Sequence, residues 1–310
     1  METSRAPALL EVAPADAGRR LDAFLAERLS LSRAASRRLL ACGAVCLDGR
    51  RLATGAKGVA LRAGERIEIA DGAGAEDVAP EPDLPLVVLA RGPGWLAVDK
   101  PAGMPVHPLA PGERGTLLGA LAARHPEVLG VGGEGALRSG IVHRLDVDTS
   151  GALLVATAAD AWRRLRGAFR AHRVAKTYRA IALGRVEADG GIALPLITAR
   201  HRPASVRAAR AEESARARIT RTRWRVVERL HRATLLEVET ETGFLHQVRA
   251  TLAHLGHPLA GDRRYAAGAD PTGAPRHMLH ASALRFEEIE SRSPDAPDFA
   301  ELLATLREAP

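Results

Sequence analysis

The chain of 310 residues has few cysteines, few aromatic residues and no long hydrophobic run. Its only cysteines, Cys42 and Cys46, give no disulfide framework, and no second Cys or Cys/His pair has the spacing that would complete a zinc site. We interpret both as buried small hydrophobic residues. No run of about 18 apolar residues is present, and residues 1–13 lack the apolar core of a signal peptide. We therefore expect a soluble cytoplasmic protein without membrane contacts.

Lysine is scarce as well, since all but three of the 44 basic residues are arginine. The net charge of +7 and the isoelectric point near 10.3 indicate an anionic partner, which for a soluble protein is most often nucleic acid. A genome rich in G and C would also favour arginine, so the charge alone leaves nucleic-acid binding open. The composition is that of an ordinary globular protein, long enough for about two domains.

The first 70 residues predict a small module of two short helices followed by strands. Apolar residues recur at helical spacing in two segments, namely Leu21, Phe24, Leu25 and Leu29, then Ala35, Leu39 and Leu40. Arg33 and Arg37 are four residues apart and project from one face of the second helix, away from that core. Gly43 ends the helix, a strand at Val45 and Leu47 meets the turn at 48–49, and another strand follows at 65–69.

This order resembles the S4 RNA-binding domain over about residues 18–70. The matching elements are Arg20-Leu21-Asp22, Ser32-Arg33, Gly43-Ala44-Val45 and Asp48-Gly49. The resemblance implies that Arg33 and Arg37 contact RNA phosphates. From the residues alone, a helical pair with a solvated arginine face remains the alternative.

Residues 71–85 are acidic, rich in Pro and Gly and without periodicity, which predicts a linker. A second domain begins at residue 86 with strands at 86–89 and 95–99, joined by a Gly-Pro-Gly turn. Further along, the pattern predicts an amphipathic helix over about 159–171 and a strand over 174–183. We thus divide the chain into 1–70, the linker 71–85 and a larger domain over 86–310.

One polar segment has the arrangement expected of a catalytic carboxylate. His143-Arg144-Leu145-Asp146 is followed by Asp148, Thr149, Ser150 and Gly151, and then by the apolar run 152–156. The acid therefore lies in a short loop ahead of a strand that looks fully buried, which is a rigid support. Asp146 is the candidate nucleophile.

Two further residues are candidates for the same site. Leu245, Val248, Leu252 and Leu255 form an apolar helical stripe that ends at Gly256 and Pro258. Arg249 lies at the edge of this stripe, and a half-buried guanidinium needs a carboxylate or phosphate partner. We predict that this partner is Asp146, with a surface position of Arg249 as the alternative. Tyr178, one of only two tyrosines, shares a strand face with Lys176, although such a tyrosine is often purely structural.

Together these segments resemble the RluA-type pseudouridine synthases. The matching blocks, in the family's order over about residues 86–290, are Lys100-Pro101-Ala102-Gly103 with Val106-His107-Pro108; Gly140-Ile141-Val142-His143-Arg144-Leu145-Asp146 with Thr149-Ser150-Gly151; Lys176-Thr177-Tyr178; His246-Gln247-Val248-Arg249 with Gly256-His257-Pro258 and Gly261-Asp262; and Leu279-His280-Ala281. Many members of this family also carry an S4 domain.

The resemblance implies that the protein isomerises specific uridines in structured RNA, ribosomal RNA first and transfer RNA second. It assigns catalysis to Asp146, Tyr178 and Arg249, and it implies that Arg144 holds the target nucleotide out of its stack. We add His143, His246 and Gln247 as expected substrate contacts. No metal, organic cofactor or nucleotide cofactor is expected, and we expect a monomer. The fold should be α+β, a mixed and mainly antiparallel sheet with flanking helices and a central cleft.

The chemistry is consistent with these residue types. Cleavage of an N-glycosidic bond builds positive charge on the ribose, which an ionised carboxylate can stabilise or attack. A guanidinium beside the acid favours its charged form. Tyr178 can stack on the extruded base or take part in proton transfer, and sequence does not decide between these roles.

Some residues depart from the family pattern, and other functions stay open. Phe244 and Leu245 replace Arg followed by Thr or Ser, Thr251 replaces a common His, and Ala266 replaces Gly. The arginines over 200–225 are RNA contacts or a solvated face. The alternatives are a non-catalytic S4-type RNA-binding or assembly protein and a carboxylate-dependent nucleoside or glycan hydrolase. The hydrolase would need a second acid, for which Asp148 and Asp262 are weak candidates.

Overall fold

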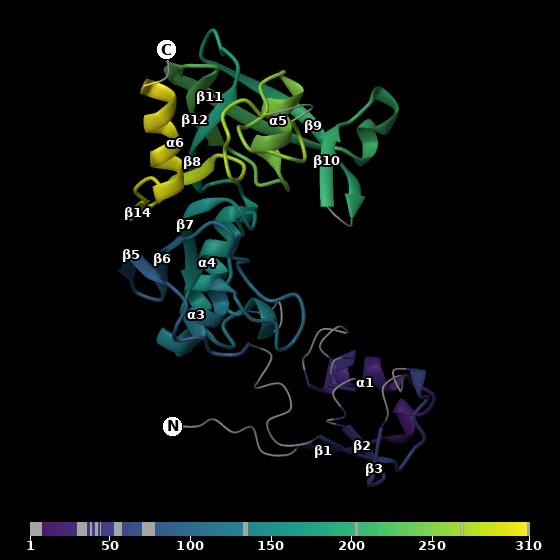
Figure 1. Cartoon of the computed structure of the whole chain (residues 1–310). Coiled ribbons are helices and arrows are strands. Elements are labelled where there is room, and N and C mark those ends of the chain that lie inside the picture. The colour runs from purple at the N-terminus through teal and green to yellow at the C-terminus, as the bar shows by residue number, and fades with distance from the viewer. Residues whose placement is uncertain are drawn as a thin grey trace.

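The computed structural model describes residues 8–29, 36, 37, 39, 40, 43, 45–52, 58–69, 78–132, 136–201, 204–266, 268 and 270–308. The predicted RNA contact of Arg33 and the interpretation of Cys42 concern residues outside these ranges. The described residues form two separate sheets, one of four strands and one of ten (Figure 1). Among the described residues, no helix has the length and apolar character needed to cross a membrane.

The N-terminal sheet is antiparallel, with strand order β1-β4-β2-β3. Its elements are β1 (Ala8–Glu11), the 3-10 helix η1 (Pro14–Asp16), α1 (Leu21–Arg28), β2 (Val45–Leu47), β3 (Arg50–Arg51) and β4 (Arg66–Ile69). Asp48 and Gly49 both have positive φ, which produces the tight hairpin predicted between β2 and β3. The sheet and α1 bury a core of their own that includes Phe24, Leu40 and Ile67.

Cys46 corrects one expectation in this module. We predicted a buried small hydrophobic residue, but Cys46 is a free, partly exposed thiol. It follows Val45, which is buried in the core, and successive side chains of a strand point to opposite faces. The alternation of the strand therefore turns Cys46 away from the core.

The large sheet has the strand order β10-β9-β11-β12-β8-β13-β7-β6-β5, and β14 pairs with β13 outside this path. Its strands are β5 (Val87–Gly92), β6 (Trp95–Lys100), β7 (Ser150–Ala156), β8 (Ala175–Leu183), β9 (Gly190–His201), β10 (Ala204–Ala208), β11 (Arg218–Leu230), β12 (Ala233–Thr240), β13 (Leu279–Phe286) and β14 (Ile289–Arg292). The pairing of β13 with β7 is parallel, and the other pairings along this order are antiparallel. The prediction of an α+β fold with a mixed, mainly antiparallel sheet is confirmed.

Helices and short 3-10 turns lie along this sheet (Figure 1). They are α3 (Leu117–Arg124), η3 (Pro126–Val128), η4 (Ala136–Arg138), α4 (Ala159–Arg170), η5 (Ala211–Arg216), α5 (Gln247–His254) and α6 (Pro297–Glu308). The predicted helix over 159–171 and strand over 174–183 correspond to α4 and β8. The helix expected from residue 245 begins at Gln247, because His246 adopts a left-handed conformation with φ of 50°.

The interior strand β7 is the support for the candidate site. All seven of its residues are buried, as the apolar run predicted. At its start Gly151 has a positive φ, and a Cβ there would lie 2.3 Å from the carbonyl oxygen of Ala281. Only glycine allows β7 and β13 to approach so closely. The loop that carries Asp146 ends on this tightly packed strand.

Candidate active site

The Asp146 loop is tied to the core from both sides. Lys100 is fully buried, and its Nζ donates hydrogen bonds to the carbonyl oxygens of Pro101 (2.7 Å), Met104 (2.9 Å) and Val147 (2.8 Å). Burial, together with the charge of Arg276, lowers the pKa of Lys100 to about 7. Lys100 therefore fastens the loop to the segment that follows β6 and is not itself exposed to a ligand.

The far end of the loop is held through Thr149 and the chain just before β13. The hydroxyl of Thr149 and Nε2 of His277 share a hydrogen bond of 2.9 Å, and both side chains are buried. Burial lowers the pKa of His277 to about 4, so this ring is neutral near pH 7. These contacts hold the backbone around Asp146 while its own side chain stays 20% exposed.

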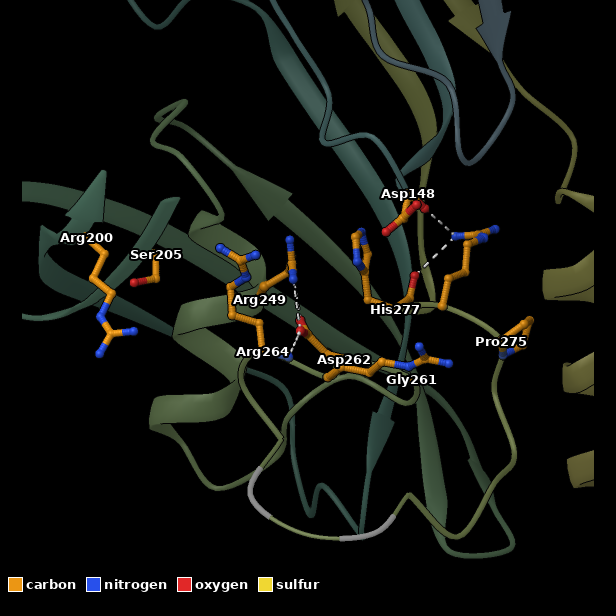
Figure 2. A pocket seen from close by; sticks show the side chains of 11 residues that line it. Asp148, Arg200, Ser205, Arg249, Gly261, Asp262, Arg264, Pro275 and His277 are labelled. Carbon is orange, nitrogen blue, oxygen red and sulfur yellow. Dashed lines mark hydrogen bonds and ion pairs between the residues drawn. The ribbon is translucent and has the colours of Figure 1, made fainter. Parts of the chain in front are cut away.

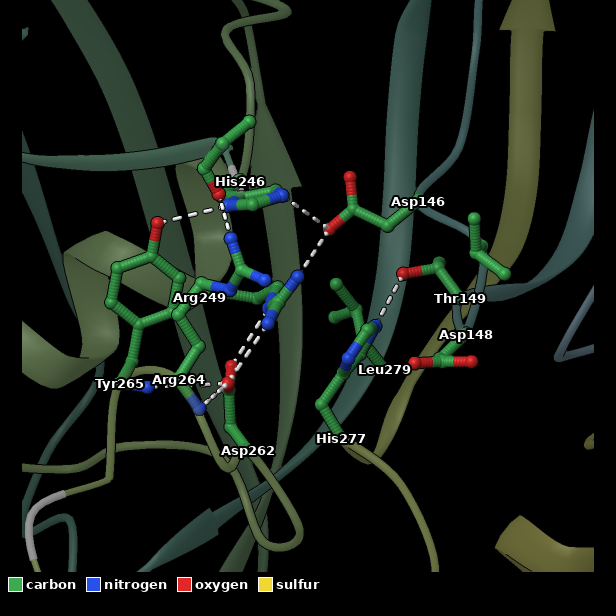
Figure 3. Close-up of polar contacts among 12 residues, drawn as sticks. Asp146, Asp148, Thr149, His246, Arg249, Asp262, Arg264, Tyr265, His277 and Leu279 are labelled. Carbon is green, nitrogen blue, oxygen red and sulfur yellow. Dashed lines mark hydrogen bonds and ion pairs between the residues drawn. The ribbon is translucent and has the colours of Figure 1, made fainter. Parts of the chain in front are cut away.

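Arg249 lies beneath Asp146 and contacts two carboxylates (Figure 3). Its Nη1 donates to Oδ2 of Asp146 at 2.9 Å, which is the predicted pairing. Its Nε and Nη2 donate to the two carboxylate oxygens of Asp262 at 2.7 and 2.9 Å. With 7% of its surface exposed, Arg249 is more buried than the half-buried position expected from the helical pattern. The alternative of a surface arginine is excluded.

Asp262 fixes the orientation of this arginine. Its side chain is fully buried, and besides Arg249 it accepts hydrogen bonds from the backbone N–H groups of Arg264 (3.1 Å) and Tyr265 (3.3 Å). Burial works to lower the pKa of Arg249, but the hydrogen bonds and charges of Asp262 and Asp146 outweigh it and raise that pKa. The guanidinium is therefore a permanent cation with one N–H group directed at Asp146.

His246 supplies a second polar group near Asp146. Its Nε2 lies 3.8 Å from Oδ2 of Asp146, and its Nδ1 lies 2.9 Å from the phenol oxygen of Tyr265. That oxygen already accepts a hydrogen bond from the backbone N–H of Val206 at 2.9 Å. We therefore infer that the phenol O–H donates its hydrogen bond to His246 Nδ1. Burial lowers the pKa of His246. The neutral ring then carries its proton on Nε2, facing Asp146.

Tyr178 lies on β8 and is partly buried against a hydrophobic cluster of β12 and α5. Burial and the charge of Asp146 raise the pKa of Tyr178 to about 12, although a hydrogen bond with Thr240 opposes this shift. The phenol is therefore close enough to Asp146 to respond to its charge, and it stays protonated at neutral pH.

Two residues predicted to contact substrate have structural surroundings instead. Gln247 is 4% exposed, and its amide accepts from Thr242 Oγ1 (2.8 Å) and Phe244 N (3.1 Å) and donates to Arg221 O (3.0 Å) and Thr222 Oγ1 (3.1 Å). This set saturates the amide. His143 accepts a hydrogen bond from Leu154 N at 2.9 Å and stacks on Phe169. Both environments favour structural roles over the predicted contacts.

The predicted arginine contacts lie at the surface. Arg144 is exposed, two residues before Asp146. In the N-terminal module the Nε of Arg37 donates to Oδ2 of Asp22 at 2.9 Å, and the Arg37 side chain is 49% exposed. The part of its guanidinium beyond Nε is available to a ligand.

A cavity of about 530 Å³ opens on the Asp262 side of Arg249 (Figure 2). Its lining residues are Asp148, Arg200, Ser205, Arg249, Gly261, Asp262, Arg263, Arg264, Pro275, Arg276 and His277. Because Arg249 contacts Asp146 and also lines the cavity, the candidate carboxylate and the cavity are adjacent. Within the part of the chain that the structure describes, no group of three His, Cys, Asp or Glu side chains is arranged to hold a metal ion.

Sequence reasoning missed the supporting residues of the site. Asp262 was considered only as a weak second acid, whereas it is the buried partner of Arg249. The signal was its place in the Gly261-Asp262 block. Lys100 was matched as part of a loop motif, but its contact with Val147 joins positions 47 residues apart, which no local pattern reveals.

The chain is similar to known proteins over most of its length. Residues 94–254 match the sequence profile of the RNA pseudouridylate synthase family. The chain is 40% identical over 284 residues to an uncharacterized RNA pseudouridine synthase of Chloroflexus aurantiacus, an alignment that spans 88% of this chain and 83% of the relative. It is 35% identical over 311 residues to the ribosomal large subunit pseudouridine synthase D of Xanthomonas campestris pv. campestris, spanning 94% and 90% of the two chains.

A solved structure has the same fold. Human RNA Pseudouridylate Synthase Domain Containing 1 superposes with a TM-score of 0.58 at 24% identity, over 73% of this chain and 96% of that one. The sequence relationships define the class: the chain belongs to the RNA pseudouridylate synthase family and is an enzyme of that family. The resemblance to RluA-type members is confirmed.

Proposed function

We propose that this chain converts specific uridines of ribosomal large-subunit RNA to pseudouridine, with Asp146 as its catalytic carboxylate. The observation that supports this most strongly is the accessible Asp146 side chain on the buried, doubly anchored Arg249 (2.9 Å). The choice of RNA rests on the ribosomal large subunit pseudouridine synthase D of Xanthomonas campestris, which aligns with nearly the whole chain.

In this reaction the bond between ribose C1′ and uracil N1 breaks, and a bond between C1′ and C5 forms. N1 gains a proton and C5 loses one, so the base is isomerised without any co-reactant. We assign to Asp146 the stabilisation of, or attack on, the positively charged ribose carbon. Arg249 keeps a cation beside the carboxylate. The protonated Tyr178 supplies an aromatic face and an O–H group near the same acid.

The target base has to leave its stack to reach Asp146. We propose that Arg144, exposed beside the carboxylate, holds the nucleotide in that position. All three proposed catalytic groups come from one chain, so a monomer suffices for the reaction. An RNA substrate also agrees with a cytoplasmic protein.

We further propose that residues 1–70 form an S4-like RNA-binding module joined by the linker 71–85 to the catalytic domain. The separate sheet and core of this region support the division. Arg37 is half exposed, and among the residues that the structure describes it is our candidate for a phosphate contact.

The hydrolase alternative loses one of its two candidates for the second acid, Asp262. Asp262 is fully buried and bound by two N–H groups of Arg249, so it cannot act as a general acid toward a ligand. The remaining candidate, Asp148, is exposed.

The test is to map pseudouridines in ribosomal and transfer RNA from cells with and without this protein. We expect one or more sites in large-subunit ribosomal RNA to revert to uridine in the deletion and to be restored by the wild-type gene. Sites lost only from transfer RNA would replace the proposed substrate. An unchanged map in both RNAs would contradict the proposal.

A further inference from the structure

The cavity beside Arg249 has the charge of an anion-binding site. Of the eleven described residues that line it, five are arginines and two, Asp148 and Asp262, are acids. Asp262 is already bound by Arg249, and Arg276 is paired with Asp298 outside the lining set, at 2.6 Å. The remaining charges are Arg200, Arg263 and Arg264 against Asp148, which leaves an excess of positive charge at the opening.

These three arginines have few commitments within the protein. Arg200 and Arg263 are exposed, and within the described ranges neither has a carboxylate at ion-pair distance. Arg264 donates through Nη1 to the carbonyl oxygen of Ala204 at the start of β10. Some exposed arginines of the same domain are paired, for example Arg207 with Glu213 at 2.6 Å, while others such as Arg216 and Arg218 have no carboxylate at ion-pair distance within the described ranges. The cavity arginines therefore have free N–H donors for an external anion.

The backbone fixes where these arginines lie. Gly261 has φ of +74°, and a Cβ there would lie 1.8 Å from the carbonyl oxygen of Arg276. Only glycine lets the segment 261–264 pack against the chain at Arg276 and bring Arg263 and Arg264 to the opening. Arg200, near the end of β9, is among the residues that line the cavity and lies on the side of Ser205 in Figure 2. Two separate segments thus form the charged wall.

The lining chemistry suits a phosphate and not a base. Among the described residues, no aromatic side chain other than His277 lines the cavity, and His277 is buried and bonded to Thr149. A nucleobase or other planar ligand would need an apolar or aromatic surface to stack on. Arginine N–H groups, by contrast, match phosphate oxygens in bidentate geometry.

We propose that Arg200, Arg263 and Arg264 form a subsite for the RNA backbone, binding a phosphodiester next to the target nucleotide. This rests on the proposed function, since Arg249 joins the cavity to Asp146. The subsite acts in binding, because its three arginines contact phosphate and not the reacting carbon. It explains why this face of the domain carries cations that the fold itself does not use.

The test measures RNA affinity and single-turnover pseudouridine formation for Arg200→Ala, Arg263→Ala and the double variant, on an unmodified transcript of large-subunit ribosomal RNA. Each single variant should bind about 5- to 10-fold more weakly, and the slope of log K against log salt should fall by about 1 for each arginine–phosphate pair removed. The loss should appear mainly in affinity, and the rate at saturating RNA should fall by less than the affinity does. Arg200→Lys and Arg263→Lys should recover part of the affinity.

Arg91→Ala is the matched control, an exposed arginine on β5 at the opposite edge of the sheet. It should leave affinity and salt slope as in the wild type. Equal affinity and slope for the wild type and the double variant, in an enzyme that still converts RNA, would overturn the subsite but not the proposed function. No conversion by the wild type on any ribosomal or transfer RNA would instead contradict the proposed function.

A competition experiment separates an RNA subsite from a site for small anions. Inorganic tripolyphosphate should compete with RNA for the wild-type protein and compete less well for the double variant. Competition that is lost in the double variant without any change in RNA affinity would mean that the cavity binds a small anion, and the proposal would be wrong.

Discussion

Two aspartates of this chain are each held by arginine, with opposite burial. In the N-terminal module the Asp22 side chain is 1% exposed, while its partners Arg20 and Arg37 are 54% and 49% exposed. At the candidate active site the cation is the buried partner, with 8% of the Arg249 side chain exposed against 20% for Asp146.

The difference distinguishes a structural acid from one that can react. Asp22 is buried and accepts hydrogen bonds from Arg20 and Arg37. These hydrogen bonds, that of Arg20 first, outweigh the effect of burial and hold the pKa of Asp22 at about 2, below the ordinary 3.8. Asp146 remains accessible because its cation lies beneath it and is fixed by Asp262. An accessible acid beside a buried, permanently charged cation is the arrangement that the proposed role of Asp146 needs.

The largest effect should follow from removing the buried cation. Arg249→Met leaves the buried carboxylate of Asp262 without its charged partner, and breaking a buried pair in this way costs about 3–5 kcal/mol. The matched variant Arg37→Met leaves Asp22 with Arg20 and should cost at most about 1 kcal/mol, because the Arg37 side chain is half exposed. Chemical denaturation of both variants measures the contrast, and similar losses would remove the distinction between the two aspartates.

A smaller effect should follow from loosening the cation without removing it. In Asp262→Asn the guanidinium loses its charged partner and can turn away from Asp146, and such misplacement lowers turnover by about 100-fold. Single-turnover rates at saturating RNA should fall while RNA affinity stays within a few-fold. A variant that lost affinity and kept its rate would show that Asp262 acts on binding and not on positioning.

Asp22, the buried aspartate of the N-terminal module, predicts a pH effect on stability. Because the folded pKa of Asp22 is depressed to about 2, its contribution is fully present above pH 3.8 and is lost as the pH falls toward 2. Hydrogen exchange of peptides from 20–29, corrected for intrinsic rates, should show this loss. Asp22→Asn should remove the pH dependence. If the variant keeps the pH dependence of the wild type, another group causes it.

A still smaller effect concerns the two tyrosines. Burial raises the pKa of Tyr178 to about 12 and raises that of Tyr265 as well. Tyrosinate absorbance in the native protein should therefore begin above the ordinary value of 10. The stabilisation from Tyr178 is complete below pH 10 and is lost as the pH rises toward 12. Native absorbance that follows the unfolded curve would contradict the buried position of Tyr178.

His246 allows a spectroscopic test of the same site. Tyr265→Phe removes the phenol O–H that donates to His246 Nδ1 in our assignment. Without this donor, the ring is no longer held with its own proton on Nε2. Nitrogen chemical shifts of His246 should change from those of a single tautomer to those of a mixture. Identical shifts in the variant would mean that Tyr265 does not set the tautomer.

Much of this site follows from residues that lie close together in sequence. The apolar run after Asp146 predicted the buried β7, and helical spacing predicted that Arg249 needed an acidic partner. The local pattern was enough for these two predictions because the spacing and polarity of side chains along a strand or helix are visible in neighbouring residues. The resemblance of five ordered blocks then named the class of enzyme.

The rest depends on tertiary contacts that no local pattern contains. The amide of Gln247 is saturated only because β11 passes beside it, and His143 is engaged by the backbone of β7. Both look like substrate contacts in the sequence because polar residues beside a catalytic acid resemble each other whether they face the ligand or the core. The left-handed backbone of His246, which delays the helix by two residues, is equally invisible in the pattern.

The central claim is that Asp146 is the reacting carboxylate. Asp146→Asn keeps the shape of the side chain and should bind RNA within a few-fold of the wild type, while pseudouridine formation falls at least about 1000-fold, or about 4 kcal/mol. Asp160→Asn, an exposed acid on α4, serves as the control and should be unaffected. Turnover of Asp146→Asn within tenfold of the wild type would contradict the assignment.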